Sequence, residues 1–285
     1  MAPPLIIDGL SDVAAGYDAL LCDAWGVIHN GRELFPGVAE ALTKFRDNRG
    51  PVVILTNAPR LSEAIPPQLD RLGLPAGAYD AVVTSGDATR ATVAERTDVS
   101  FFQLGPNKDD TLFKATGREF VPLEEAGAIL CTGLFDDLTE TPEDYRDMLA
   151  GAAARGLPMI CANPDRVVKF GDRMIYCAGS LADLYEELGG TTVFCGKPQA
   201  PIYDTARQAL AEAGWKSGRI LAIGDGLQTD ILGANRQGID VAFVADGIFA
   251  EHSRGATGRI DPQKLGDLLE SHGVHAQFAL DGLKW

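Results

Sequence analysis

The sequence has no paired cysteines, no excess of basic residues and no long apolar run, and each absence narrows the class of protein. Its five cysteines are scattered without a Cys-x-x-Cys pair, which is typical of a reducing cytoplasm. No apolar run approaches the roughly 20 residues that span a bilayer, so no membrane is expected. The first residues carry no basic segment, and a signal peptide is therefore not expected either.

Acidic residues dominate the charge. The chain has 40 acidic and 25 basic residues and a formal net charge of −15. The electrostatic field of this negative charge repels nucleic acid and anionic membranes, so neither is expected as a partner. A small anionic substrate is not excluded, because one Mg²⁺ and one lysine can reverse the potential inside a pocket. The composition, 46% apolar and 23% charged over 285 residues, is that of a globular protein with room for two domains.

One stretch, from Leu20 to Val27, organises the rest of the chain. An apolar run that begins near Tyr17 predicts a buried strand of a parallel sheet, and the run ends at Asp23, three residues before Gly26. In open α/β sheets, ligands bind beyond the carboxyl ends of the strands. On its own, Asp23 is either a chemical group or an ordinary turn residue.

Three further buried strands also end in polar residues. They are expected at 51–57, 192–198 and 219–225, and they lead into Thr56 with Asn57, Lys197, and Asp225 with Asp230. Helical patterns alternate with these strands, which predicts a doubly wound α/β sheet. Strand ends of a parallel sheet share one edge, so we expect these polar groups to meet. Carboxylates, a hydroxyl and a cation can together hold Mg²⁺ and phosphate, and a carboxylate can accept a phosphoryl group covalently.

A second, smaller domain is expected within the first. Between about residues 100 and 176 the apolar runs are shorter and surround a helix expected at 142–155, a pattern that we interpret as an inserted α+β domain. Only 33 positions separate Asp23 from Thr56, but 141 separate Thr56 from Lys197, enough for a domain. The predicted boundaries are 1–85 and 180–285 for the core and 86–179 for the insertion.

Four motifs, in this order, resemble those of the haloacid dehalogenase-like hydrolases. They are Asp23-Ala24-Trp25-Gly26-Val27, Leu55-Thr56-Asn57, Gly196-Lys197-Pro198 and Gly224-Asp225-Gly226-Leu227-Gln228-Thr229-Asp230-Ile231. Together with Ala162-Asn163-Pro164-Asp165 they are similar, more narrowly, to subfamily IIA, the NagD-like phosphatases. The resemblance implies a Rossmann-like core and a cap of the C2 type between the second and third motifs, where the spacing also leaves room for it.

The resemblance also implies roles for individual residues. Asp23 would be the nucleophile that becomes an aspartyl-phosphate, and Lys197 would neutralise both Asp23 and the substrate. Thr56 and the backbone of Asn57 would bind phosphate oxygens, with Asp165 as a further substrate-binding residue. The expected substrate is a small phosphomonoester, and the expected location is the cytoplasm. The oligomeric state is left open, a homo-oligomer included.

The same resemblance implies a Mg²⁺ site. Its ligands would be the carboxylate of Asp23, the backbone carbonyl of Trp25 and the carboxylate of Asp225, and Asp230 would support the metal indirectly. Trp25 departs from the phosphatase pattern, which has a second aspartate at this position to protonate the leaving oxygen. A change of side chain leaves a backbone ligand intact, but it removes a proton donor that typically contributes 10²- to 10⁴-fold.

Several hypotheses follow from Trp25. The substrate can have an aryl or acyl leaving group that needs little protonation, or a cap residue can supply the acid, with Asp165, Asp136 and Asp137 as candidates. A dehalogenase reaction is a third hypothesis, disfavoured because the metal-binding aspartates are retained and the insertion lies elsewhere. A non-enzymatic function is the alternative: the protein would bind a phosphorylated metabolite without turning it over. His29, just past the first motif, is interpreted as structural or solvated and not as catalytic.

Overall fold

The larger part of the molecule is built on a seven-stranded sheet. The computed structural model describes residues 3–255 and 257–285. Every neighbouring pair of strands in this sheet is parallel. In spatial order the strands are β1 (Leu5–Ile6), β13 (Phe278–Leu280), β12 (Asp240–Val244), β11 (Ile220–Gly224), β2 (Ala19–Cys22), β3 (Val52–Thr56) and β4 (Ala81–Thr84).

Helices cover both faces of this sheet. All five residues of β3 are buried, and successive side chains of a strand point to opposite faces. Ile54 therefore packs in the cluster that contains α1 (Val38–Asn48), and Val53 packs in the cluster that contains α7 (Ala200–Glu212). The predicted Rossmann-like parallel core is confirmed. The core is completed by α2 (Pro66–Leu72), α8 (Leu232–Arg236), α9 (Ala250–Ser253) and α10 (Pro262–Ser271).

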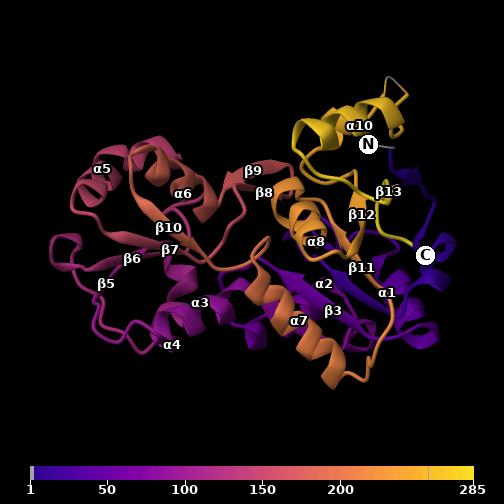
Figure 1. Cartoon of the computed structure of the whole chain (residues 1–285), viewed down its shortest axis with the longest axis horizontal. Helices are drawn as coiled ribbons and strands as arrows, with labels where there is room; N and C mark the ends of the chain where they lie inside the picture. The colour runs from indigo at the N-terminus through magenta and orange to yellow at the C-terminus, as the bar shows by residue number, and fades with distance from the viewer. Residues whose placement is uncertain (1–2, 256) are drawn as a thin grey trace.

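A second sheet lies beside the first (Figure 1). Its four strands, in spatial order, are β10 (Thr191–Phe194), β7 (Pro158–Cys161), β6 (Ala128–Cys131) and β5 (Phe101–Leu104), all parallel. Alternate residues of β6 again face opposite sides, Ile129 in one apolar cluster and Leu130 in another. The helices of this part are α3 (Ser85–Ala94), α4 (Asp110–Ala115), α5 (Arg146–Ala154) and α6 (Ala178–Glu187).

Two details of the predicted inserted domain are wrong. Its sheet is parallel, so the part is α/β and not α+β; the antiparallel pair there is the hairpin of β8 (Val167–Phe170) and β9 (Arg173–Tyr176). The core also does not resume near residue 180, because α6 packs on the smaller sheet and β10 pairs with β7. A four-residue apolar run looks the same in either sheet, and only its long-range pairing decides which sheet it joins.

Local signals in the sequence correspond well to the structure. Thr141 is the N-cap of the helical segment that begins at Pro142, and its backbone N–H donates to Asp144 Oδ2 at 2.8 Å. That segment starts as a 3₁₀ turn and continues as α5. Near the end of the chain, β13 lies between β1 and β12. None of the helices in the described ranges is both long and apolar enough to cross a bilayer.

Candidate active site

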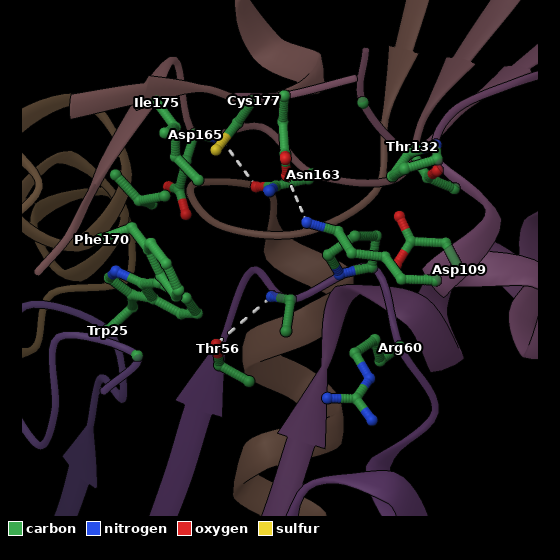
Figure 2. A pocket seen from close by; sticks show the side chains of 18 of the residues that line it. Trp25, Thr56, Arg60, Asp109, Thr132, Asn163, Asp165, Phe170, Ile175 and Cys177 are labelled. Atoms are coloured by element: carbon green, nitrogen blue, oxygen red, sulfur yellow. Dashed lines mark hydrogen bonds and ion pairs between the residues drawn. The ribbon is translucent and has the colours of Figure 1, made fainter. Parts of the chain in front are cut away.

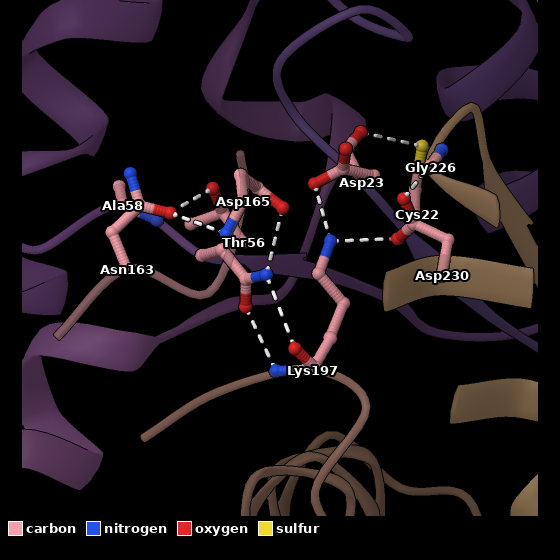
Figure 3. Close-up of polar contacts among 10 residues, drawn as sticks. Cys22, Asp23, Thr56, Ala58, Asn163, Asp165, Lys197, Gly226 and Asp230 are labelled. Carbon is pink, nitrogen blue, oxygen red and sulfur yellow. Dashed lines mark hydrogen bonds and ion pairs between the residues drawn. The ribbon is translucent and has the colours of Figure 1, made fainter. Parts of the chain in front are cut away.

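A buried lysine forms the centre of the site. Lys197 Nζ lies 2.6 Å from Asp23 Oδ1 and 2.7 Å from Asp230 Oδ1 (Figure 3). Lys197 exposes only 2% of its surface. Burial by itself lowers the pKa of Lys197, but the two carboxylates outweigh burial and hold that pKa well above its ordinary value. The lysine is therefore charged and fixes both carboxylates in place.

Asp225 joins these two carboxylates. Oxygens of Asp23, Asp225 and Asp230 lie within 4.8 Å of one another, and all three residues are buried. Backbone amides orient them, with Ile248 N donating to Asp225 Oδ2 and Gly226 N donating to Asp230 Oδ2, both at 3.1 Å. Three carboxylates against one ammonium leave an excess of buried negative charge. Hard oxygen ligands of this kind fit Mg²⁺.

The pKa values reflect this excess of negative charge. Burial, followed by the charge of Asp230, raises the pKa of Asp225 to about 7. Burial and Asp230 also raise the pKa of Asp23 well above its ordinary value, against the opposing effect of Lys197. A bound divalent cation would supply the positive charge that these carboxylates lack.

Gly26 allows the first loop to approach the carboxylates. Its φ of 86° is in the left-handed region, and a Cβ built on it would lie 2.3 Å from Asp225 Oδ2. A side chain at this position would displace Asp225. The peptide between Trp25 and Gly26 therefore packs against the acidic cluster, where the carbonyl of Trp25 can serve as a further oxygen ligand.

Asn57 joins the core to the smaller sheet. Its Nδ2 donates to Asp165 Oδ1 at 2.9 Å, and its Oδ1 accepts from Lys197 N at 2.8 Å. Thr56 faces the larger cavity, and its Oγ1 accepts from Ala58 N at 3.2 Å. The polar strand ends that the sequence indicated do come together around Lys197.

They come together from two sheets, which corrects one step of the prediction. Lys197 follows β10 of the smaller sheet, whereas Asp23 and Asp225 follow core strands and Thr56 ends one. Asp165 follows β7, also of the smaller sheet. The site thus forms where the carboxyl ends of two parallel sheets face each other.

Two cavities occupy the space between the sheets. One, of about 270 Å³, is lined by Asp23, Asp225 and Asp230. The other, of about 390 Å³, lies between Thr56 and the smaller sheet. Trp25 lines both cavities, and Figure 2 shows it beside Phe170.

Sequence reasoning missed the polar residues that the smaller sheet brings to the larger cavity. Asp109 follows β5 and Thr132 directly follows β6, and both line that cavity with Lys108. The signal was available, because these residues come just after buried strands, as Asp23 does. Because the inserted domain was expected to be α+β, the ends of its strands were not expected to meet at one edge, and the signal was not used.

Three other candidates lie outside the acidic cluster. Asp136 is in an exposed turn, where it accepts from Leu138 N at 3.0 Å. Asp137 lines the larger cavity but is paired with Lys108. His29 is buried, and burial lowers its pKa to about 4, so it is neutral and structural, as interpreted from the sequence.

Comparison with known proteins identifies the family. The family model described as haloacid dehalogenase-like hydrolase matches residues 20–119, and a second, described as HAD-hydrolase-like, matches residues 194–270. A hydrolase of the haloacid dehalogenase-like family from Brucella suis 1330 is 39% identical, with a TM-score of 0.85 over 98% of this chain and 100% of that one. The chain belongs to the haloacid dehalogenase-like hydrolases.

Curated relatives narrow this placement. Ribonucleotide monophosphatase NagD from Escherichia coli is 28% identical over 80% of this chain and 88% of its own length. D-glycerol 3-phosphate phosphatase from Mycobacterium tuberculosis is 26% identical over 84% of this chain, which spans 66% of that protein. A structure of glycerol phosphate phosphatase from that organism in complex with magnesium has a TM-score of 0.62 at 24% identity, with 89% of this chain and 77% of that one covered. The chain is a member of subfamily IIA, the NagD-like phosphatases.

Removal of the buried Lys197 ammonium should destabilise the protein, because the carboxylates that contact it would remain buried. We expect Lys197→Met to lower the free energy of unfolding by about 3–5 kcal/mol in EDTA, because it leaves buried carboxylates without a counter-charge. Adding Asp230→Asn should recover part of that loss, as measured by urea unfolding. Lys114→Met, at a lysine whose side chain is 79% exposed, is the control and should change stability by less than about 0.5 kcal/mol. Strictly additive effects at Lys197 and Asp230 would contradict this account.

Metal binding should stabilise the folded protein. At a Mg²⁺ concentration of 100 times Kd, the free energy of unfolding should rise by about 2.7 kcal/mol. Asp225→Asn removes a metal ligand and one buried charge, so this variant should lose the Mg²⁺ increment without losing stability in EDTA. Thermal and urea unfolding measure both effects. An equal Mg²⁺ increment in wild type and variant would show that the ion binds elsewhere.

Proposed function

We propose that this protein is a Mg²⁺-dependent phosphatase that hydrolyses a small phosphomonoester through a phosphorylated Asp23. The observation that carries the proposal is the buried contact of Lys197 with both Asp23 and Asp230, with Asp225 in the same cluster. The relatives named as phosphatases of nucleotides and of glycerol phosphate support the class of substrate. The scattered buried thiols support a cytoplasmic location.

In the first step Asp23 attacks phosphorus. Lys197 binds Asp23 Oδ1, so Oδ2 is the oxygen left for the attack. A bond forms between Oδ2 and phosphorus, the bond between phosphorus and the ester oxygen breaks, and the leaving oxygen takes up a proton. Lys197 neutralises the charge on the nucleophile and on the phosphoryl oxygens, and Thr56 with the Asn57 backbone holds those oxygens. Water then attacks the phosphorus of the aspartyl-phosphate, which releases phosphate and restores Asp23.

Asp23, Asp225 and the carbonyl of Trp25 would hold Mg²⁺, with Asp230 in support. Both oxygens of Asp230 are already engaged, one by Lys197 and one by Gly226 N, which suits an indirect role. When bound, the metal supplies positive charge that stabilises the negative charge developing on the phosphoryl group. The magnesium complex of the related glycerol phosphate phosphatase supports the choice of ion.

We propose Asp165 as the proton donor that replaces the missing acid. The indole N–H of Trp25 donates to Lys169 O at 2.9 Å, so it is committed to the backbone. Asp165 is the candidate carboxyl that lines both cavities, and burial raises its pKa. Asn57 occupies Asp165 Oδ1, so Oδ2 is the oxygen that would carry the proton.

Asp23→Asn should abolish turnover, because an amide cannot form the acyl-phosphate. We expect phosphate release to fall about 10⁴-fold or more for every substrate. The matched control is Asp18→Asn, at the amino end of β2, where the carboxylate accepts from Arg219 N. That variant should stay within about twofold of wild type. Full turnover by Asp23→Asn would exclude this mechanism.

Asp165→Asn should act according to the leaving group. Release from an alkyl phosphate should drop about 10²- to 10⁴-fold, while release from 4-nitrophenyl phosphate, whose leaving oxygen needs no proton, should change little. Steady-state kcat values for the two substrates measure this split. If wild type already discriminates this steeply and Asp165→Asn adds nothing, the enzyme works without an acid on activated substrates.

Trp25 also favours one alternative. A protein without a proton donor at this position can bind a phosphorylated metabolite through Lys197 and Mg²⁺ without turning it over. Phosphate release from aryl, acyl, sugar and nucleotide phosphates, with Mg²⁺ and then with EDTA, separates the two functions. Absence of release from every substrate, with binding retained, would establish the alternative.

A further inference from the structure

Trp25 stands at the boundary between the two cavities. The smaller cavity holds the carboxylates that would carry the chemistry, and the larger one extends from Thr56 toward the smaller sheet. A phosphomonoester with its phosphoryl group at Asp23 therefore places its leaving group past the ring of Trp25. Whatever fixes that ring also fixes the shape of the leaving-group site.

Contacts on several sides fix the ring. Its N–H donates to Lys169 O at 2.9 Å, and the ring lies 5.1 Å from His29 and 6.3 Å from Phe170, centre to centre. Gly31 passes beneath it with a φ of 85°, and a Cβ there would lie 2.7 Å from the indole. The uncharged His29 ring and the side-chain-free Gly31 together leave the indole one position.

The same contacts hold the β8–β9 hairpin against the first loop of the core. Gly171, at the tip of the hairpin, donates its N–H to Asn30 O at 3.1 Å. The guanidinium of Arg32 lies 4.9 Å from the centre of the Phe170 ring. The position of Trp25 and the position of the hairpin are therefore coupled, although one belongs to the core and the other to the smaller part.

One side of the larger cavity is apolar as a result. Trp25, Phe170 and Ile175, here called the apolar wall, lie together on that side (Figure 2). Two charged groups elsewhere in the cavity already have partners. Lys108 is paired with Asp137, and Arg60 Nη1 donates to Gln68 Oε1 at 2.7 Å.

Two polar atoms nearby, Asp109 Oδ2 and Thr132 Oγ1, are buried. Both atoms are sealed from the cavity, and their residues expose only 2% and 3% of their surface. On the side of the apolar wall, a leaving group rich in hydroxyls would give up hydrogen bonds to water without finding replacements. A flat aromatic leaving group loses few hydrogen bonds to water, and it packs on the apolar wall.

We propose that Trp25 determines specificity: held by Lys169 and the β8–β9 hairpin, its ring forms the wall on which an aromatic leaving group packs, so the preferred substrates are aryl phosphomonoesters. This inference rests on the proposed function for its reaction, but it concerns binding. It can therefore be tested without turnover.

The test compares two phosphonates that cannot be hydrolysed, benzylphosphonate and 2,3-dihydroxypropylphosphonate. Calorimetry on the whole protein with Mg²⁺ gives Kd for each at the same pH. We expect wild type to bind benzylphosphonate at least about tenfold more tightly. Trp25→Leu, which removes the ring, should bring the two Kd values within about twofold of each other.

Two further variants separate the role of the ring from general damage. Trp25→Phe keeps an aromatic ring but loses the N–H bond to Lys169, so both phosphonates should bind about fivefold more weakly while the preference stays above fivefold. Trp215→Phe makes the same change at a tryptophan that packs on the core and lines neither cavity, and it should leave both Kd values unchanged.

Three results would overturn the inference: equal affinity of wild type for the two phosphonates, a preference that survives in Trp25→Leu, or no binding of benzylphosphonate. The proposed function fails separately, through absence of Mg²⁺-dependent phosphate release from phenyl phosphate. A preference for benzylphosphonate without any phosphate release would support the specificity site but contradict the proposed enzymatic function.

Discussion

The buried ammonium of Lys197 is the interaction on which the site depends. A lysine this deeply buried keeps its charge only because Asp23 and Asp230 contact it directly, and those carboxylates remain at the end of the cavity only because the lysine compensates part of their charge. Neither partner is stable there alone. The remaining excess of negative charge is what a bound divalent cation would compensate.

This contact forms because two parallel sheets face each other. Parallel strands present their carboxyl ends along one edge, and ligands collect at that edge. Here the core contributes Asp23 and Asp225, and the smaller sheet contributes Lys197 and Asp165. The two sheets therefore place polar side chains at one site in the same way, each at the carboxyl ends of its strands. The cap is more than a cover, because it supplies the central cation.

Trp25 shows how one substitution can exchange one role for another. A carboxylate at this position could donate a proton, whereas the indole donates its N–H to β8 and packs between His29 and Phe170. The backbone next to it still approaches the acidic cluster, because Gly26 packs against Asp225 whatever side chain precedes it. A change of side chain at this position therefore leaves the approach of the backbone to Asp225 intact.

The sequence by itself indicated the family, the parallel core and the polar residues that gather around Lys197, because these depend on local patterns: buried apolar runs that end in Asp23, Thr56 and Asp225, and motifs in a fixed order. Only the tertiary structure decided that β10 joins the smaller sheet, so that Lys197 reaches Asp23 from the opposite side. Strand pairing depends on residues far apart in the chain, and the short run of β10 does not record which sheet it joins. For the same reason the contact of Trp25 with Lys169, 144 positions away, had no signal in the sequence.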